Sequence, residues 1–358
     1  MSRLDGYIRE TPEALGRLID APPAVEPVRA ALVGRKLRKI WISGSGTSLF
    51  ASEIAARIWE EALGIDAEAI GALQFREQVE SLYIGPDTLV IAISQTGATN
   101  VLVEALSVAR ARGALSIACT AFPESPLAQA ADITLDSRTG PENTPGKTKG
   151  FITTTVAVGI VALALADDDW RAPTEALLDK IVATLAATDI AIDDWVMRLK
   201  EAKAIWTVGS GRMAPAAVEG GLKILEVAKL PVIGKELEEM MHGQFHAIGE
   251  GAGIVFVAGI MSKANRIGDL RRVIDTVNVP VVAIADGQAA AACHDLKWDL
   301  VLDTAGVGPF EPLVGAIPLQ LLAEKLARAR GLDPDQPRYP ELYRISGSKS
   351  IYAKAAGK

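Results

Sequence analysis

The chain has 358 residues, of which 49% are hydrophobic and 23% are charged, and its formal net charge is −7. This composition is that of a folded globular protein, and the length is enough for two domains. The acidic balance argues against the broad basic surface of a nucleic-acid-binding protein. It leaves room for a small anionic ligand, because backbone amides at helix N-termini can hold one locally.

Cysteine usage and the apolar segments predict a cytoplasmic protein. Cys119 and Cys293 lie far apart and form no CxxC motif, which argues against a disulfide framework or a zinc site. The first residues lack the apolar core of a signal peptide. The apolar stretch 151–166 is too short for a membrane span and predicts a buried helix. We therefore expect no metal, no cofactor and no membrane association.

After a helical lead-in, apolar strands alternate with helices along the chain. The first cycle has strands over 37–43, 88–94, 115–119 and 133–135 and helices over 47–63 and 101–112. A long helical segment over 174–200 precedes a second cycle, with strands over 204–208, 253–258, 279–285 and 298–302 and helices over 214–227 and 265–277. Gly-Ser-Gly follows the first strand of each cycle, so the pattern repeats at an offset of about 165 residues.

This alternation is typical of parallel sheets covered by helices on both faces. The sequence therefore predicts an α/β protein built of two doubly wound lobes in tandem. We expect the lead-in over 1–36, the first lobe over 37–172 and the second over 173–330. A last helix over 313–330 leads into a tail over 331–358.

Two strand ends in the first lobe carry small and hydroxyl-bearing residues where a helix begins. Open α/β sheets bind ligands at such places, and amides with hydroxyls suit a phosphate or a similar anion. Neither loop has the Walker or the dinucleotide pattern, and an alternative is that the hydroxyls only cap helices. The matching segment of the second lobe, 259–263, lacks the hydroxyl cluster, which favours an anion site in the first lobe alone. The candidate ligand-binding residues are Gly46, Thr47, Ser48, Ser94, Gln95, Thr96 and Thr99.

A helix of the second lobe carries three charged residues that share one face. Glu219, Lys223 and Glu226 are spaced i, i+4 and i+7. The spacing alone favours a solvated, salt-bridged face. His242, which follows an acidic stretch over 236–241, fits either a helix C-cap or a general acid–base group at neutral pH.

Taken together, these segments resemble the SIS (sugar isomerase) family over nearly the whole chain. The likeness is to its double-domain members, which include the isomerase half of glucosamine-6-phosphate synthase, SIS-type deaminases and fructosamine-6-phosphate deglycases. The segments that carry it are GSGTSLFASEIAARIWEE at 44–61, ISQTGAT at 93–99, GPENTPGKTKGF at 140–151, EGGLKILE at 219–226, HG at 242–243 and DPDQPR at 333–338. Thr96 stands where serine is usual in the family.

The resemblance implies tandem flavodoxin-like lobes and a role for each candidate residue. The two loops of the first lobe would hold an anion on C6 of a sugar. Glu226 would move a proton between C1 and C2, and His242 would open the sugar ring. Glu219 and Lys223 would orient Glu226 or contact the sugar. Because the equivalent histidine comes from the neighbouring subunit in the family, the resemblance implies a homodimer with shared active sites.

The resemblance also implies that two other segments approach the substrate. Thr148 and Lys149 would lie near the ligand, and the tail over 331–358 would cover the active site. The synthase and the deaminases keep a lysine four residues after the Pro-Arg of the tail motif, where this chain has Leu342. Lys349, further along, is the candidate replacement. No glutaminase domain precedes the first lobe in this sequence, which disfavours the synthase activity.

The sequence thus predicts an aldose–ketose isomerase acting on a hexose with an anionic 6-substituent. Phosphate is the default anion and sulfonate the alternative. Deglycation of fructosamine 6-phosphates or deamination of an aminosugar 6-phosphate is the close alternative, because it needs the same proton step. A sugar-phosphate sensor without activity is the remaining alternative, which Glu226 and His242 disfavour and which no helix-turn-helix supports.

Overall fold

The computed structural model describes residues 1–81, 83–259 and 265–345, which form two compact units. The first-sheet unit comprises, of the described residues, 13–142, 149–174 and 338–345. The second-sheet unit comprises residues 1–12, 143–148 and 175–337. Each unit contains one five-stranded parallel sheet, so the predicted α/β class with two doubly wound lobes is confirmed.

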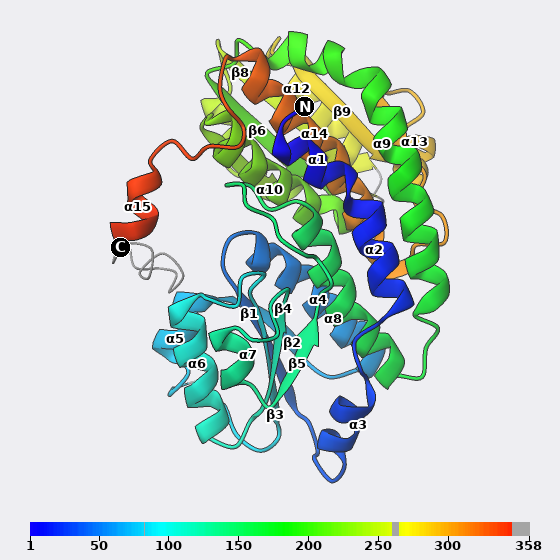
Figure 1. Ribbon diagram of the computed structural model, residues 1–358. Coiled ribbons are helices and arrows are strands. Elements are labelled where there is room, and N and C mark those ends of the chain that lie inside the picture. The colour runs from blue at the N-terminus through cyan, green and yellow to red at the C-terminus, as the bar shows by residue number, and fades with distance from the viewer. Residues whose placement is uncertain (82, 260–264, 346–358) are drawn as a thin grey trace. The chain divides into compact units, whose positions relative to one another are not determined.

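The first-sheet unit has the strand order β2-β1-β3-β4-β5. Its strands are β1 (Lys39–Gly44), β2 (Ala67–Gly71), β3 (Thr88–Ile93), β4 (Leu115–Thr120) and β5 (Ile133–Asp136). One face packs on α4 (Thr47–Leu63) and α8 (Lys149–Leu165), and the other on α5 (Ala72–Gln78), α6 (Asn100–Ala111) and α7 (Pro126–Ala130) (Figure 1). The central strands β3 and β4 are buried at every residue, as expected for a sheet covered on both faces.

The second-sheet unit repeats this topology with the order β10-β9-β8-β6-β7. Its strands are β6 (Ala204–Gly209), β7 (Val232–Glu236), β8 (Ala252–Ala258), β9 (Val281–Asp286) and β10 (Leu300–Leu302). One face of the sheet packs on α11 (Leu237–Met241), α12 (Asn265–Thr276) and α13 (Gly287–Ala292). The helices α10 (Ala214–Lys223) and α14 (Glu311–Ala329) pack against each other.

Further helices precede, connect and follow the two sheets. They are α1 (Arg3–Arg9), α2 (Thr11–Asp20), α3 (Glu26–Leu32), α9 (Arg171–Leu199) and α15 (Pro340–Ile345), with short 3-10 turns η1 (Gly211–Met213), η3 (Gln244–Ala247) and η4 (Gly308–Phe310). The lead-in is helical as predicted. The apolar stretch 151–166 is the buried helix α8, also as predicted. Among the helices described, none is long and apolar enough to cross a membrane.

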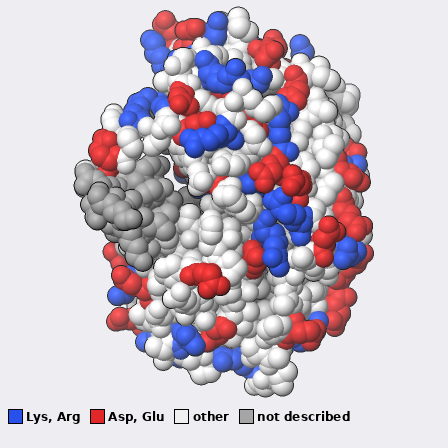
Figure 2. All heavy atoms as spheres, viewed as in Figure 1, with Lys and Arg blue, Asp and Glu red and all other residues white. Residues whose placement is uncertain are grey.

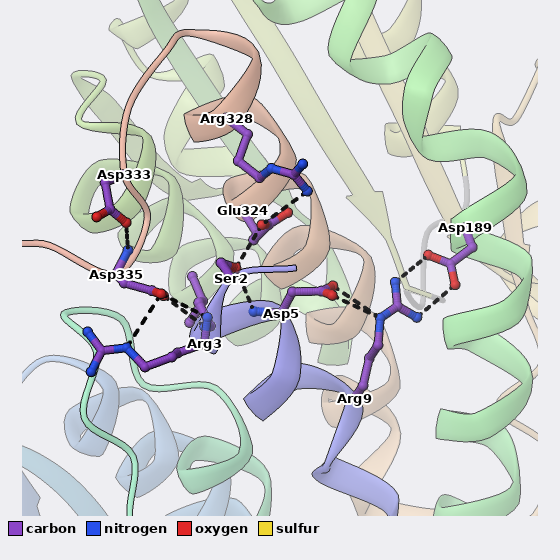
Figure 3. Close-up of polar contacts among 10 residues, drawn as sticks. Ser2, Arg3, Asp5, Arg9, Asp189, Glu324, Arg328, Asp333 and Asp335 are labelled. Atoms are coloured by element: carbon purple, nitrogen blue, oxygen red, sulfur yellow. Dashed lines mark hydrogen bonds and ion pairs between the residues drawn. The ribbon is translucent and has the colours of Figure 1, made fainter.

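The start of α1 is hydrogen-bonded to α14 and to the first residues of the tail, within the second-sheet unit (Figure 3). The backbone amides of Arg3 and Leu4 donate to the two carboxylate oxygens of Asp335, at 2.8 and 2.9 Å. The Ser2 hydroxyl donates to Glu324 at 2.8 Å and accepts from the amide of Asp5. These bonds satisfy amides that a helix N-terminus leaves without intrahelical partners.

The sequence did not predict the strands β2 and β7, which occupy the same edge position in the two sheets. β2 (AEAIG) and β7 (VIGKE) are short and carry charged residues. A half-exposed edge strand lacks the continuous apolar run by which the central strands were recognised.

Candidate active site

The strand order places the two hydroxyl-rich loops of the first-sheet unit next to each other at the carboxyl ends of the parallel strands. The order 2-1-3-4-5 has its topological switch point between β1 and β3, where doubly wound sheets bind ligands. β1 and β3 pair directly, with Ser43 opposite Ala92, and the loops 44–48 and 94–99 follow their carboxyl ends. The structure therefore brings Gly46, Thr47 and Ser48 to the same end of the sheet, the carboxyl ends of its strands, as the loop that begins at Ser94.

The first loop depends on glycine to enter α4. A Cβ atom on Gly44 would lie 2.5 Å from the Ser48 carbonyl oxygen, so the chain can turn this tightly only without a side chain. Gly46 has φ +56° and ψ −126°, a region that is essentially restricted to glycine. This turn delivers Thr47 and Ser48 to the first turn of α4.

The second loop is a tight turn whose hydroxyls face one another. Ser94 Oγ and Thr99 Oγ1 lie 3.1 Å apart, and Thr99, the N-cap residue of α6, makes no side-chain capping bond. The alternative in which the hydroxyls only cap helices is therefore wrong for Thr99. Gly97 has φ +60°, and a Cβ there would lie 1.9 Å from Ser125 Oγ. Thr96, beside Gly97, is partly exposed.

Gln95 offers a buried polar group in this loop. The Gln95 backbone carbonyl accepts from the Ala121 amide and the Thr120 hydroxyl, which fixes the main chain. The side-chain oxygen Oε1 is buried and has no hydrogen-bond partner among the described residues. Because a half-turn of the amide exchanges its oxygen and nitrogen, this group can present either an acceptor or a donor to a ligand.

The start of α8 adjoins the second loop. A Cβ on Gly150 would lie 3.2 Å from Gln95 Cγ, and the Gly150 amide donates to Glu142 Oε2 at 3.2 Å. Lys149, predicted to lie near the ligand, has a buried side chain whose Nζ lies near Gly140. Glu142 and Gly150 belong to the segment singled out in the sequence, but their contact with each other could not be read from it.

The charged face predicted on the second-lobe helix is a compact cluster. Lys223 Nζ lies 3.3 Å from Glu219 Oε1 and donates to Glu226 Oε2 at 2.6 Å. The side chains of Glu219, Lys223 and Glu226 are 0%, 1% and 27% exposed. The interpretation as a solvated face is therefore wrong for Glu219 and Lys223. Burial alone would lower the pKa of Lys223, but attraction to the two carboxylates outweighs it and holds the pKa above its ordinary value.

Glu226 lies in a π-helical turn rather than in the α-helix that the sequence predicts. The turn η2 (Ile224–Ala228) continues α10 and ends at Lys229, which has φ +56°. Such turns insert an extra residue into a helix and occur frequently at functional sites. Here the turn leaves Glu226 partly exposed while its neighbours Ile224 and Val227 are fully buried.

The loop 143–148 lies directly against Glu226, within the second-sheet unit. A Cβ on Gly146 would lie 2.9 Å from Val227 Cγ2 and 3.8 Å from Glu226 Oε2. Gln320 Nε2, on α14, donates to the Thr148 carbonyl at 3.3 Å, which holds the end of this loop against α14. Sequence reasoning missed Gly146, although its small size in the quoted segment GPENTPGKTKGF is the signal of a close backbone approach.

His242 lies apart from this cluster. It directly follows α11, its side chain is 72% exposed, and its Nε2 lies 3.5 Å from Glu238 Oε1. In the described part of the chain it forms no hydrogen bond or ion pair with Glu226. The structure thus brings Glu219, Lys223 and Glu226 together but not His242.

At the corresponding switch point of the second sheet, hydrogen bonds join the residues that follow β6 and β8. The Ser210 hydroxyl donates to the Gly259 carbonyl at 2.9 Å and lies 3.1 Å from the Gly259 amide. The rest of the segment that was compared with the first lobe, 260–263, lies outside the described residues, as does Lys349. Leu342 is an exposed residue of α15.

The distribution of surface charge bears on nucleic-acid binding, and the grouping of His, Cys, Asp and Glu side chains bears on metal binding. On the face shown in Figure 2, Lys and Arg are interspersed with Asp and Glu rather than gathered into one basic surface. Over residues 1–81, 83–259 and 265–345, no group of three or more His, Cys, Asp or Glu side chains is arranged to hold a metal ion.

Comparisons with known proteins cover most of the chain. Residues 35–166 match the family model described as SIS domain. The glutamine–fructose-6-phosphate aminotransferases (isomerizing) of Bradyrhizobium diazoefficiens and Pyrobaculum aerophilum are 29% and 31% identical to this chain, over 84% and 92% of it. The chain spans about half the length of these relatives, 51% and 55%.

A solved structure shows the same fold. The C-terminal domain of glucosamine-fructose-6-phosphate aminotransferase from Francisella tularensis superposes with a TM-score of 0.82 at 24% identity. The match covers 94% of this chain and 98% of that domain. It confirms the arrangement of two tandem α/β lobes.

Proposed function

We propose that the chain, whose residues 35–166 match the SIS domain model, is an aldose–ketose isomerase acting on a hexose with an anion on C6. The observation that carries this proposal is the setting of Glu226. Its carboxylate is partly exposed, bonded through Oε2 to the buried ammonium of Lys223, and held in a π turn beside Gly146, which has no side chain. A positioned carboxylate of this kind can move a proton in the transition state.

In the proposed reaction, Glu226 takes the C2 proton of the open-chain aldose as a general base. The electrons form a C1–C2 double bond, and the C1 carbonyl oxygen takes up a proton from solvent and becomes a hydroxyl, which gives an enediol. Glu226 then returns its proton to C1, while the C2 hydroxyl releases its proton to solvent and becomes the ketose carbonyl. Lys223 fixes the carboxylate and offsets its charge, and His242 serves in ring opening.

The two loops of the first-sheet unit are proposed to hold the anion. Ser94 and Thr99 supply paired hydroxyls, Gln95 supplies a buried amide, and the loop at Thr47 and Ser48 lies at the N-terminus of a 17-residue helix. Hydroxyls, amides and a helix N-terminus favour a phosphate, and they would also accept a sulfonate. The relatives are named for fructose 6-phosphate, which supports phosphate as the default.

We further propose a cytoplasmic homodimer in which His242 serves the partner's site. The separation of His242 from the Glu226 cluster within the second-sheet unit supports this arrangement. Both cysteines are free and buried, which fits a reducing compartment.

The test is a substrate screen in deuterated water. The panel contains hexose 6-phosphates, 6-sulfo hexoses, fructosamine 6-phosphates and aminosugar 6-phosphates, and the readouts are deuterium at C1 or C2 and release of amine or ammonia. We expect an aldose–ketose 6-phosphate pair to interconvert with deuterium incorporation. Release of amine or ammonia with that pair inert would assign C–N cleavage instead, and a panel without exchange would contradict enzymatic activity of either kind.

A further inference from the structure

A hollow in the first-sheet unit opens at the amino-terminal ends of the strands, opposite the two hydroxyl-rich loops, 44–48 and 94–99, which we call the anion loops. It lies where the chain enters β1 and β3, since Arg38 directly precedes β1 and Asp87 directly precedes β3. Its volume is about 670 Å³, within the range of about 300 to 1,000 Å³ that small-molecule sites span. We call it the basic hollow, after the cations Arg35, Lys36 and Arg38 that line it.

The basic hollow concentrates positive charge in a chain whose net charge is −7. Arg35, Lys36 and Arg38 face a single lining carboxylate, Asp87. Within the described ranges, none of the three cations forms an ion pair. Lys39, one position further along, lies in ion pairs with Asp66 and Glu68. The lining of the hollow therefore has a net positive charge, whereas the charge of Lys39 is offset by its two carboxylate partners.

Hydrogen bonds fix the wall of the hollow in place. Arg35 Nη1 donates to the carbonyls of Pro86 and Gly113, both at 3.0 Å, and the Arg38 amide donates to the Asp87 carbonyl at 2.9 Å. These bonds join the loops that precede β1, β3 and β4. Two of the five guanidinium N–H donors of Arg35 are used in this way, which leaves three for a ligand.

Tyr83 adds an aromatic surface to the same wall. Its hydroxyl donates to Asp87 Oδ2 at 2.8 Å, and the Arg38 guanidinium lies 5.8 Å from its ring centroid. The Tyr83 side chain is nevertheless 62% exposed. Asp87 is thus hydrogen-bonded to Tyr83, and Lys36 and Arg38 line the hollow beside it.

We propose that the basic hollow binds a small diphosphate. The net charge of the lining side chains is positive, and Arg35 and Arg38 are three positions apart in irregular chain, so their Cα atoms lie at most about 10 Å apart. The two linked phosphate groups of a diphosphate can each accept charge-assisted hydrogen bonds from one of these guanidinium groups. A ring attached to the diphosphate would meet the exposed face of Tyr83. This site is independent of the proposed isomerase activity.

The test is calorimetric titration of the full chain with inorganic pyrophosphate and with ADP at physiological ionic strength. We expect saturable binding at one site, and the double variant Lys36→Glu/Arg38→Glu should weaken it by at least about tenfold, because it removes two charge-assisted bonds. Tighter binding of ADP than of pyrophosphate would assign a ring-bearing diphosphate, and equal affinities would assign the diphosphate alone.

Two controls make the outcome specific. Arg57→Glu/Arg171→Glu changes the net charge equally at exposed positions of the same unit and should leave binding within about twofold. Ser94→Ala/Thr99→Val alters the anion loops and should also leave pyrophosphate binding intact. The proposal is overturned if the wild type shows no saturable binding, if Lys36→Glu/Arg38→Glu binds like the wild type, or if either control loses binding equally.

Discussion

Lys223 shows how a single residue changes the meaning of a charge pattern. The spacing of Glu219, Lys223 and Glu226 was correctly recognised as one helix face, but spacing alone could not show which way the face points. The direction of the face is set by tertiary packing, which buries Glu219 and Lys223 almost completely. The sequence could therefore name the candidate residues of this cluster but not their burial or the position of Gly146.

Removing the Lys223 ammonium should destabilise the fold. Lys223→Met leaves the fully buried Glu219 without its cation, and breaking a buried pair in this way costs about 3–5 kcal/mol. Urea unfolding would measure the loss. Glu219→Gln/Lys223→Met should recover much of it, and Lys297→Met, at an exposed lysine, is the control. A Lys223→Met protein as stable as the wild type would contradict the paired arrangement.

Gly97 should be required for ligand binding as well as for the turn. Gly97→Ala places a methyl group in the space of Ser125 Oγ at positive φ, which should displace the loop and weaken sugar-phosphate binding by at least about tenfold. Gly64→Ala is the matched control, because Gly64 has φ +64° with open space around it. Equal losses in the two variants, measured by calorimetry, would show that strain alone and not the loop geometry is responsible.

At the level of elements, prediction succeeded where apolar runs are long. The central strands and the helices α4, α8 and α14 lie close to their predicted positions, whereas β2 and β7 were missed because an edge strand is short and mixed in polarity. The π turn around Glu226 could not be predicted, because nothing in the run EGGLKILEVAK breaks an α-helical pattern. It is the packed structure that shows the extra residue.

The contact between α1 and α14 contains a buried carboxyl group whose titration should be visible. The Glu324 side chain is fully buried, accepts from Ser2, and has one oxygen without a partner among the residues described (Figure 3). Burial raises the pKa of Glu324, nearby Asp5 raises it further, and Ser2, Arg328 and Lys325 oppose the shift. The folded state therefore holds this proton more tightly than the unfolded state does.

As a result, Glu324 should cost stability as pH rises from its ordinary pKa through its raised one, because only the unfolded chain ionises freely. Glu324→Gln removes this ionisation while keeping the acceptor for Ser2. Its unfolding free energy, relative to the wild type, should increase in urea titrations as the pH rises above the ordinary pKa of a glutamate, about 4.3. Glu250→Gln, at an exposed side chain, is the control. A difference that does not change with pH would contradict the raised pKa.

At the level of the whole molecule, the two lobes share a topology but differ in chemistry. The hydroxyl-rich loops follow β1 and β3, and the carboxylate cluster follows β6 on α10 and the π turn. The sequence predicted this division of residues between the lobes. The expectation of a homodimer with shared sites came only from the family resemblance, because a single chain carries no direct record of its partner.

If sites are shared between subunits, two inactive variants should complement each other. A mixture of Glu226→Gln and His242→Ala chains, refolded or co-expressed, forms heterodimers that contain one intact pair of Glu226 and His242. With equal amounts and random pairing, about a quarter of wild-type activity should return. Each variant alone should be inactive, and no recovery in a verified heterodimer would place both groups in the same subunit.

The proposed transfer of a proton between C1 and C2 by the Glu226 carboxylate can be measured by solvent deuterium exchange in the Glu226→Gln variant. The substrate is the sugar phosphate that the wild type isomerises, and calorimetry on the same samples measures ligand binding. We expect exchange to fall by at least about a hundredfold while the dissociation constant changes by less than about threefold. Exchange at the wild-type rate in Glu226→Gln would contradict this role of the carboxylate.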